Sequence, residues 1–196
     1  MEDHIQRNSR DQARDERFKQ NPKNSNVWNF WLYRNFIYRF CNNRIRKLMH
    51  TSDKGFELIK KFEGCELEAY QCAAGVWTIG YGHTKDVQEG DKWSEEKADF
   101  MLWRELDDEY EHYVNSLVTV PMNQSQFDSL VSWTYNLGPN NLKRSSMLRV
   151  LNEGKYDEVP AQMKRWNKAK GKVLAGLTRR REAEALMFEG KSWEHI

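Results

Sequence analysis

This chain of 196 residues lacks several features that would narrow its fold or its function. Its three cysteines make no framework of disulfides, and the cysteine and histidine spacings of zinc sites are absent. No motif indicates a metal or an organic cofactor, and no apolar run approaches the roughly 18 residues of a membrane span. An odd cysteine count without a removable signal sequence favours synthesis in a reducing cytosol.

The net charge of +2 is small, but the charges are unevenly distributed. Residues 1–50 carry 11 Lys and Arg against five Asp and Glu, which gives +6, whereas the other 146 residues carry 20 against 24, which gives −4. Residues 26–50 have five basic side chains and no acidic ones. A basic and aromatic tract beside a mildly acidic domain indicates contact with an anionic surface or with a partner.

Composition divides the chain into three parts. Residues 1–25 are polar and mixed in charge, which predicts a flexible arm or an isolated helix. Residues 26–50 contain seven aromatic side chains and two arginines between positions 27 and 40, so a helix there must bury much of its surface. Residues 51–196 are long enough to form a domain whose core needs neither metals nor disulfides.

The start of this domain predicts a helix followed by a small β region. Ser52 or Asp53 can cap a first helix, and Gly64 can end it. Residues 66–84 have the composition of short strands and tight turns, and positions 77–83 are β-like and punctuated by glycine. We therefore expect a small β-containing lobe at the beginning of the domain.

The rest of the domain is predicted to be helical. One long helix starts at Ser94 and another at Asn123, where Gln126 completes a capping box. Two further helical stretches cover about 145–166 and 178–188. The expected buried face of the Ser94 helix consists of Leu102, Leu106, Tyr110, Tyr113 and Leu117. The pattern indicates two lobes joined by a long helix, with a cleft that suits an extended substrate.

Three side chains have the types and the spacing that cleavage of a glycosidic bond requires. Glu63 is followed after eight residues by Cys72, and after five more by Thr78. Glycoside hydrolysis needs an acid that protonates the leaving oxygen and a group that orients or activates water. We expect Glu63 to lie at a helix end against an apolar lobe, where desolvation would raise its pKa and keep it protonated as a general acid.

This spacing, followed by Ile79-Gly80-Tyr81-Gly82-His83, resembles the phage-type lysozymes, the muramidases that phages use as endolysins. Segments 126–138, 165–169 and 176–183 resemble the same family, and the likeness covers about residues 52–190. It implies an α+β fold, mostly helical, with a small β-containing N-lobe, a helical C-lobe and an N-terminal extension. It also implies inverting hydrolysis of the β-1,4 bond between N-acetylmuramic acid and N-acetylglucosamine in bacterial peptidoglycan.

The resemblance gives each member of the triad a role. Glu63 takes the position of the acid, and Thr78 that of the residue whose hydroxyl holds the attacking water. Cys72 stands where many relatives have Asp, and a thiol with a pKa of about 8.5 is a poor base at pH 7 unless its thiolate is stabilised. Cys72 is therefore either a thiolate base or a polar placeholder beside a water that Thr78 orders.

Further residues match or adjoin functional positions of the family. The candidates for substrate binding are Tyr70, Thr84, Tyr135, Asn136 and Arg165. His83 is expected to be structural and hydrogen-bonded to an acid in the β lobe. The arginines at 179–181 are expected to pair with Glu182, Glu184 or acids of the other lobe.

The cysteines suggest a possible redox switch. Some secreted relatives are held inactive by a disulfide that an N-terminal cysteine later exchanges. Here a bond between Cys65 and Cys72 would consume the site thiol, and Cys41 in the N-terminal tract would be the exchanging cysteine. Three reduced thiols without any regulatory role are an equal alternative.

The resemblance leaves the biological role open between two main hypotheses. The first is an endolysin, made in the host bacterial cytoplasm and acting on the cell wall in the periplasm, that lyses the host. The alternative is a virion-associated lysozyme or structural component docked through its N-terminal extension; activity on chitin is a third. Residues 26–50 would contact a membrane surface, a virion protein or the domain itself. We expect no nucleic acid partner and a monomeric enzyme domain.

Overall fold

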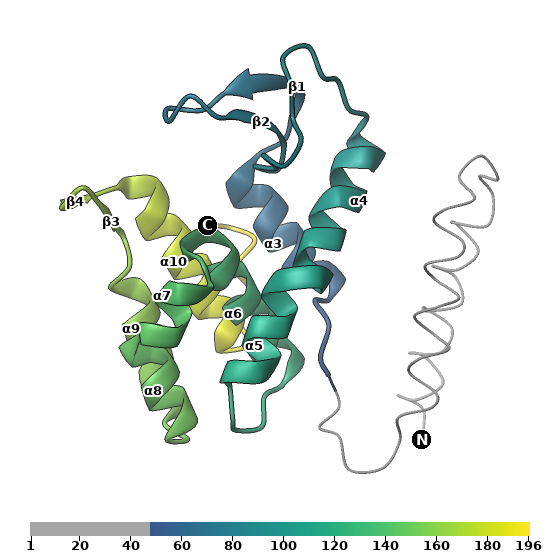
Figure 1. Cartoon of the computed structure of the whole chain (residues 1–196). Coiled ribbons are helices and arrows are strands. Elements are labelled where there is room, and N and C mark those ends of the chain that lie inside the picture. Colours follow the sequence, from purple (N-terminus) through teal and green to yellow (C-terminus); the bar gives the residue numbers. More distant parts are fainter. Residues whose placement is uncertain (1–47) are drawn as a thin grey trace, which may run out of the picture. The chain divides into compact units, whose positions relative to one another are not determined.

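The computed structural model describes residues 48–196, which form one unit beginning at Leu48 (Figure 1). The predictions for residues 1–25 and for Cys41, and almost all of those for residues 26–50, lie outside the described residues. Within the described part of the chain, no helix is both long enough and apolar enough to cross a membrane.

The first helix and the β-containing lobe form where the capping residues and the glycines predicted them. Helix α3 (Asp53–Glu63) begins at Ser52, whose side chain accepts a hydrogen bond from the third backbone N–H, and ends at Gly64, whose φ of 70° favours glycine. Strand β1 (Glu66–Gln71) then pairs antiparallel with β2 (Trp77–Gly80). The predicted β region at 77–83 is therefore confirmed.

The connection between the lobes is helical but contains an irregularity. It consists of α4 (Glu95–Glu105), a π-helical turn η1 (Leu106–Tyr110) and α5 (Glu111–Leu117), with Ser94 as the predicted cap. A π turn adds a residue to the helical repeat, so the face that follows it is rotated. Val114 is consequently buried, whereas Tyr113, predicted to be buried, is 39% exposed. That part of the predicted stripe is wrong.

Helix α6 (Gln124–Leu137) is the centre of the helical lobe. It begins at the predicted capping box of Asn123 and Gln126 and ends at Gly138, and the residues from Phe127 to Thr134 are all buried. The surrounding helices are α7 (Pro139–Arg144), α8 (Ser146–Asn152), α9 (Val159–Lys164) and α10 (Ala175–Phe188).

One predicted helix is divided in the structure. The stretch at about 145–166 consists of α8, a 3-10 turn η2 (Tyr156–Glu158) and α9, because Gly154 adopts a φ of 77° and ends α8. A hairpin of β3 (Lys168–Ala169) and β4 (Lys172–Val173) then precedes α10. The described chain thus has the expected α+β, mostly helical and two-lobed fold.

Candidate active site

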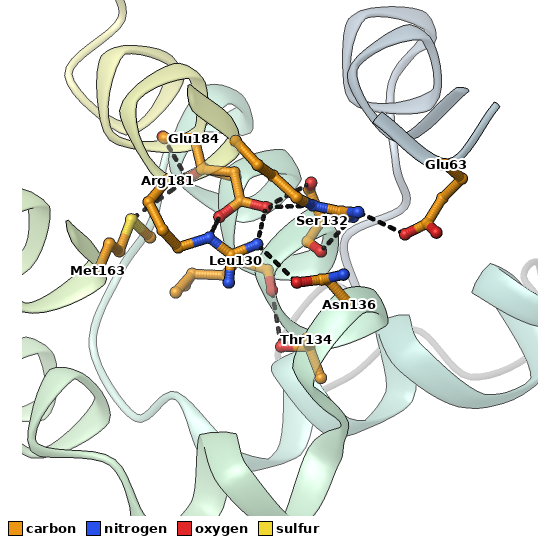
Figure 2. Close-up of polar contacts among 10 residues, drawn as sticks. Glu63, Leu130, Ser132, Thr134, Asn136, Met163, Arg181 and Glu184 are labelled. Atoms are coloured by element: carbon orange, nitrogen blue, oxygen red, sulfur yellow. Dashed lines mark hydrogen bonds and ion pairs between the residues drawn. The ribbon is translucent and has the colours of Figure 1, made fainter. Parts of the chain in front are cut away.

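Glu63 is the last residue of α3, and its carboxyl is held by an arginine. The Nη1 atom of Arg180 on α10 lies 2.5 Å from Oε1 of Glu63 (Figure 2). The Glu63 side chain is 21% exposed and that of Arg180 is 3% exposed, so the contact is reached by solvent only from the Glu63 side. The prediction that Glu63 has apolar surroundings is therefore wrong in one respect, because its carboxyl contacts the guanidinium of Arg180.

A buried polar network around Glu184 and Ser132 crosses from α10 to α6 (Figure 2), and Arg180 belongs to it. Its Nε lies 3.1 Å from Oε1 of Glu184, and its Nη2 donates to the carbonyl oxygen of Ser132 at 3.3 Å. Glu184 also accepts from the Ser132 hydroxyl at 2.9 Å and pairs with Arg181 at 2.9 Å. Two buried cations and two carboxylates thus balance one another, which buried charges require.

A hollow of about 450 Å³ opens beside Glu63. Its lining comes from the end of α3, the end of α6, the start of α10 and the C-terminus, and consists of Lys61, Phe62, Glu63, Asn136, Leu174, Gly176, Leu177, Arg179, Arg180 and Ile196. The carboxyl of Glu63 is therefore accessible from a pocket whose volume suits a small-molecule or sugar-sized ligand.

Cys72 and Thr78 lie together on the β1–β2 hairpin. Thr78 is buried in β2 opposite Tyr70, and Cys72 directly follows β1. The Thr78 hydroxyl donates to the carbonyl oxygen of Val76 at 3.0 Å and hydrogen-bonds with the Cys72 thiol. The hairpin therefore brings two members of the sequence triad into contact.

The surroundings of Cys72 favour its thiolate. The backbone N–H groups of Ala74 and Val76 hydrogen-bond with the sulfur and lower the pKa of the Cys72 thiol. Cys65, which is exposed, has the opposite environment: partial desolvation raises the pKa of its thiol, although a hydrogen bond with Tyr81 partly offsets this. Because the thiolate is the nucleophile, we expect the Cys72 thiol to be the more reactive of the two.

Cys65 and Cys72 are unpaired, and β1 separates them. A strand rises about 3.3 Å per residue, so the seven-residue step between them spans on the order of 20 Å. A disulfide needs α-carbons within about 7 Å of one another. The bond considered from the sequence would therefore require β1 to be dismantled.

The residues predicted to bind substrate differ in their exposure and in the hydrogen bonds that they form. Tyr70, Thr84 and Arg165 are exposed, and Arg165 donates to Oε1 of Gln162 at 3.1 Å. Asn136 lines the pocket while its Oδ1 accepts from Arg181 at 3.0 Å.

Tyr135 lies largely buried between the lobes. Its hydroxyl donates to the carbonyl oxygen of Tyr81 at 2.9 Å and lies 3.3 Å from Oε2 of Glu105. Burial raises the pKa of Tyr135, and the carboxylates of Glu105 and Glu63 add to this effect. The hydroxyl therefore stays a hydrogen-bond donor at the junction of β2 and α6.

His83 has the contacts of a structural residue. Its Nδ1 contacts Oε1 of Glu105, and its Nε2 lies 2.8 Å from the carbonyl oxygen of Lys85. Its ring also lies 5.1 Å, between centroids, from that of Trp93. The expected contact with an acid is present, but Glu105 belongs to α4 rather than to the β lobe.

One further group within residues 48–196 has the side chains of a metal site. Ligand-type atoms of His50, Asp107 and Glu111 lie within 4.8 Å of one another. Nδ1 of His50 lies 2.7 Å from Glu111 and 3.1 Å from Asp107, and Glu111 also accepts from the backbone N–H of Thr51 at 2.8 Å. These contacts hold the segment before α3 against η1 and α5. Ion pairing therefore explains why the three side chains lie close together.

The expected pairing of the arginines at 179–181 with Glu184 or with an acid of the other lobe is confirmed, although the sequence did not identify Glu63 as that acid. The three arginines at 179–181 were expected to be structural, and Arg180 and Arg181 are indeed buried and paired with Glu184. The partner that matters for the site, Glu63, lies 117 positions away in the chain. The available signal was the run of arginines itself, because consecutive buried cations need carboxylate partners.

Comparisons with known proteins place this geometry in a family. The sequence model of the Phage lysozyme family matches residues 60–184. An endolysin of Acyrthosiphon pisum secondary endosymbiont phage 1 is 43% identical over 145 residues, covering 72% of this chain and 99% of the relative. An endolysin of Bacillus phage B103 is 43% identical over 143 residues, covering 71% of this chain; the chain spans 54% of that relative.

Comparison with solved structures indicates the same family. The muramidase domain of SpmX from Asticaccaulis excentricus superposes with a TM-score of 0.67 and 41% sequence identity, covering 71% of this chain and 98% of that domain. Peptidoglycan is accordingly the class of substrate. The chain belongs to the phage lysozyme family and is a glycoside hydrolase of the lysozyme type.

Proposed function

We propose that this enzyme is an endolysin that hydrolyses the β-1,4 bond between N-acetylmuramic acid and N-acetylglucosamine, with Glu63 as the proton donor. The observation that carries the proposal is the half-buried Glu63 carboxyl, fixed by Arg180 at the edge of the pocket. A carboxyl beside a pocket is the group that must protonate the leaving oxygen of a sugar.

Arg180 acts as a positioning residue in this scheme. Its guanidinium contacts Glu63 while Glu184 and the Ser132 carbonyl hold it from the opposite side. A side chain held by three acceptors has little rotational freedom, so the Glu63 carboxyl is kept in one orientation toward the pocket. Fixed orientation of the acid reduces the entropy that the reaction must otherwise lose.

Thr78 and Cys72 act on the water in the proposed reaction. Because the Thr78 hydroxyl donates to the Val76 carbonyl, its oxygen can accept a hydrogen bond from a water. The thiolate-favouring contacts of Cys72 make it the base that draws a proton from that water. Attack on the face opposite to the leaving group inverts the anomeric carbon.

Mutation of the triad tests the scheme on purified peptidoglycan and on Gram-negative cells whose outer membrane has been permeabilised. We expect Glu63→Gln to lower the rate at least about 100-fold, the usual contribution of a general acid. Cys72→Asp should retain activity, because a carboxylate can serve as the base. The matched control is Glu57→Gln, which removes an exposed carboxyl from the same helix. Wild-type lysis by Glu63→Gln would refute the assignment.

The stereochemistry provides a second test. We expect early products to carry the α-anomer at the new reducing end, observed by proton NMR before mutarotation. Initial release of the β-anomer would exclude direct attack by water and replace it with a covalent intermediate.

The proposal includes a dependence on redox state. A Cys65–Cys72 disulfide cannot coexist with β1, so oxidation would unpair the hairpin that carries Thr78. We expect oxidised enzyme to regain activity on addition of a reductant, and Cys65→Ser to stay active throughout. Equal lysis by oxidised and reduced wild type would show that the thiols have no such role.

The cellular setting is also a proposal. We infer that the enzyme is made in the bacterial cytoplasm, acts as a monomer on the wall, and is retained near anionic lipid by residues 26–50, five of whose side chains are basic. Co-sedimentation of the full chain with phosphatidylglycerol vesicles, and its loss when the arginines at 34 and 39 become glutamine, would support this. Detection in purified phage particles instead would indicate a virion role.

A further inference from the structure

The segment that leads into α3 places a histidine beside two carboxylates of the connecting helix (α4, η1 and α5). Nδ1 of His50 lies 2.7 Å from Oε2 of Glu111 and 3.1 Å from Oδ1 of Asp107. One ligand-type atom from each of the three residues lies within 4.8 Å of the other two. The side chains of His50, Asp107 and Glu111 are 30%, 19% and 6% exposed, so the group is shielded on the Glu111 side and open to solvent on the His50 side.

The backbone around this group is fixed by further hydrogen bonds. Asn115 makes two, of 3.0 and 2.9 Å, with the backbone of the residue before His50, and Gln124 donates to the His50 carbonyl oxygen at 2.8 Å. Oε1 of Glu111 accepts from the N–H of Thr51 at 2.8 Å, while Oε2 of the same carboxyl contacts His50. The donor atoms are therefore preorganised, as the ligands of a metal ion need to be.

The π-helical turn η1 brings the two carboxylates to the same side of the connecting helix. The backbone N–H of Glu111 donates to the carbonyl oxygen of Leu106, five residues earlier. Asp107 and Glu111 are four residues apart, and side chains at that spacing are neighbours on a helix surface. Such turns are rare and frequently occur at functional sites, yet no residue of the proposed catalytic scheme lies in η1. Its position is explained if Asp107 and Glu111 serve a common ligand.

One imidazole nitrogen and two carboxylate oxygens are a donor set that suits zinc. Imidazole favours Zn²⁺ and its transition-metal neighbours, whereas Mg²⁺ and Ca²⁺ prefer sites made of oxygen atoms. In a tetrahedral zinc site, bonds of about 2.0–2.1 Å place the ligand atoms roughly 3.4 Å apart. The separations of 2.7 Å to at most 4.8 Å bracket this value. Coordination therefore needs only small side-chain shifts and the release of any proton on Nδ1 to solvent.

We propose that His50, Asp107 and Glu111 bind a divalent cation of the zinc type, with water as the fourth ligand, which fastens the lead-in of α3 to the connecting helix. Without the metal, the same atoms form the ion pairs described above. Glu63 lies at the far end of α3, roughly 16 Å away along its 11 residues, so the ion stabilises the fold and takes no part in cleavage. Glu111 follows His50 by 61 positions, which is why no spacing motif predicts this site.

The connecting helix offers matched controls for the test. His50→Gln and Asp107→Asn each remove one ligand, whereas His112→Gln and Asp108→Asn remove exposed side chains of the same types from neighbouring positions. The full chain is freed of metal with EDTA and titrated with zinc sulfate by calorimetry, and Tm is followed by tryptophan fluorescence. Each Tm shift is taken relative to the same variant without zinc, so a variant that is merely less stable still gives an answer.

We expect the wild type to bind one zinc ion at this site. Its Tm should rise by about 5–10 °C when free zinc exceeds Kd about 100-fold, because an ion that binds only the folded chain stabilises it. Each test variant should bind zinc at least about 100-fold more weakly, since loss of a group that merely hydrogen-bonds to a ligand already costs about 10- to 100-fold. Both controls should keep the wild-type affinity, and Mg²⁺ and Ca²⁺ should leave Tm unchanged.

The position of the metal has to be observed directly, because zinc also binds thiolates. Anomalous diffraction at the zinc edge, from zinc-soaked crystals of the full chain, should show a peak about 2.0–2.2 Å from the His50 nitrogen and the two carboxylates. A peak at Cys72 alone, a Tm shift that both test variants keep, or no zinc-dependent shift in the wild type would each overturn the inference. None of these outcomes bears on Glu63, whose role is tested separately by lysis.

Discussion

Replacing Glu184 by glutamine tests whether the buried arginine network holds the site together. Glu184 is fully buried and pairs with Arg180 at 3.1 Å and with Arg181 at 2.9 Å. After the substitution Arg180 still contacts Glu63, but Arg181 keeps only the amide oxygen of Asn136, at 3.0 Å, as a polar partner besides the new side chain. The variant therefore leaves one buried cation without a carboxylate.

The expected loss of stability follows from the distances between Glu184 and the two arginines. Opposite charges about 3 Å apart attract by roughly 5 kcal/mol at an effective dielectric constant near 20. Part of this is offset, because the carboxylate no longer has to be desolvated and the glutamine oxygen can still accept hydrogen bonds. Breaking one partner of a buried pair typically costs about 3–5 kcal/mol. We expect the free energy of unfolding to fall by about 3 kcal/mol, which for a domain of this size lowers Tm by about 6–12 °C.

Urea unfolding followed by tryptophan fluorescence measures this loss. The control is Glu182→Gln on the same helix, whose carboxylate pairs with Lys164 at the surface, with 39% of the glutamate side chain exposed. Exposed pairs contribute at most about 1 kcal/mol, so this control should change stability little. If Glu184→Gln lost no more than Glu182→Gln, the buried network would not stabilise the domain and the reasoning about Arg180 would be refuted.

Three further predictions concern other parts of the domain. Iodoacetamide should modify Cys72 before Cys65 at pH 8, since a lowered pKa gives the larger thiolate fraction; mass spectrometry showing equal rates would contradict this. Gly55→Ala should lower the free energy of unfolding by about 1–3 kcal/mol, because a β-carbon would lie 2.8 Å from side-chain carbons of Asp128, and unchanged urea stability would show that the contact relaxes. Tyr135→Phe should cost about 1 kcal/mol of stability and leave kcat within a few-fold of wild type; a large loss in kcat at unchanged stability would indicate substrate contact instead.

The features predictable from sequence are those that depend on a few adjacent residues. Ser52, Ser94 and Asn123 each cap a helix as expected, because a capping side chain reaches a backbone N–H only two or three positions away. The β1–β2 hairpin could be anticipated for the same reason, since its glycines and alternating side chains act locally.

The features that escaped prediction depend on distant contacts or on small changes of helical phase. The π turn η1 is encoded by no recognisable residue, yet it rotates α5 and exposes Tyr113. The ion pair of Glu63 with Arg180 joins residues 117 positions apart. A single sequence shows that both groups exist but not that the fold brings them together.

The site is held from two directions by different kinds of contact. Glu63 is fastened to the helical lobe by a buried ion pair with Arg180. The hairpin that carries Thr78 continues into Tyr81 and His83, which are tied by hydrogen bonds to Tyr135 and Glu105. In the proposed mechanism Glu63 is the acid and Thr78 holds the water, and these two groups of contacts fix both residues. The proposed inverting reaction needs room for a water between the substrate and the base, so loss of either group of contacts should impair it.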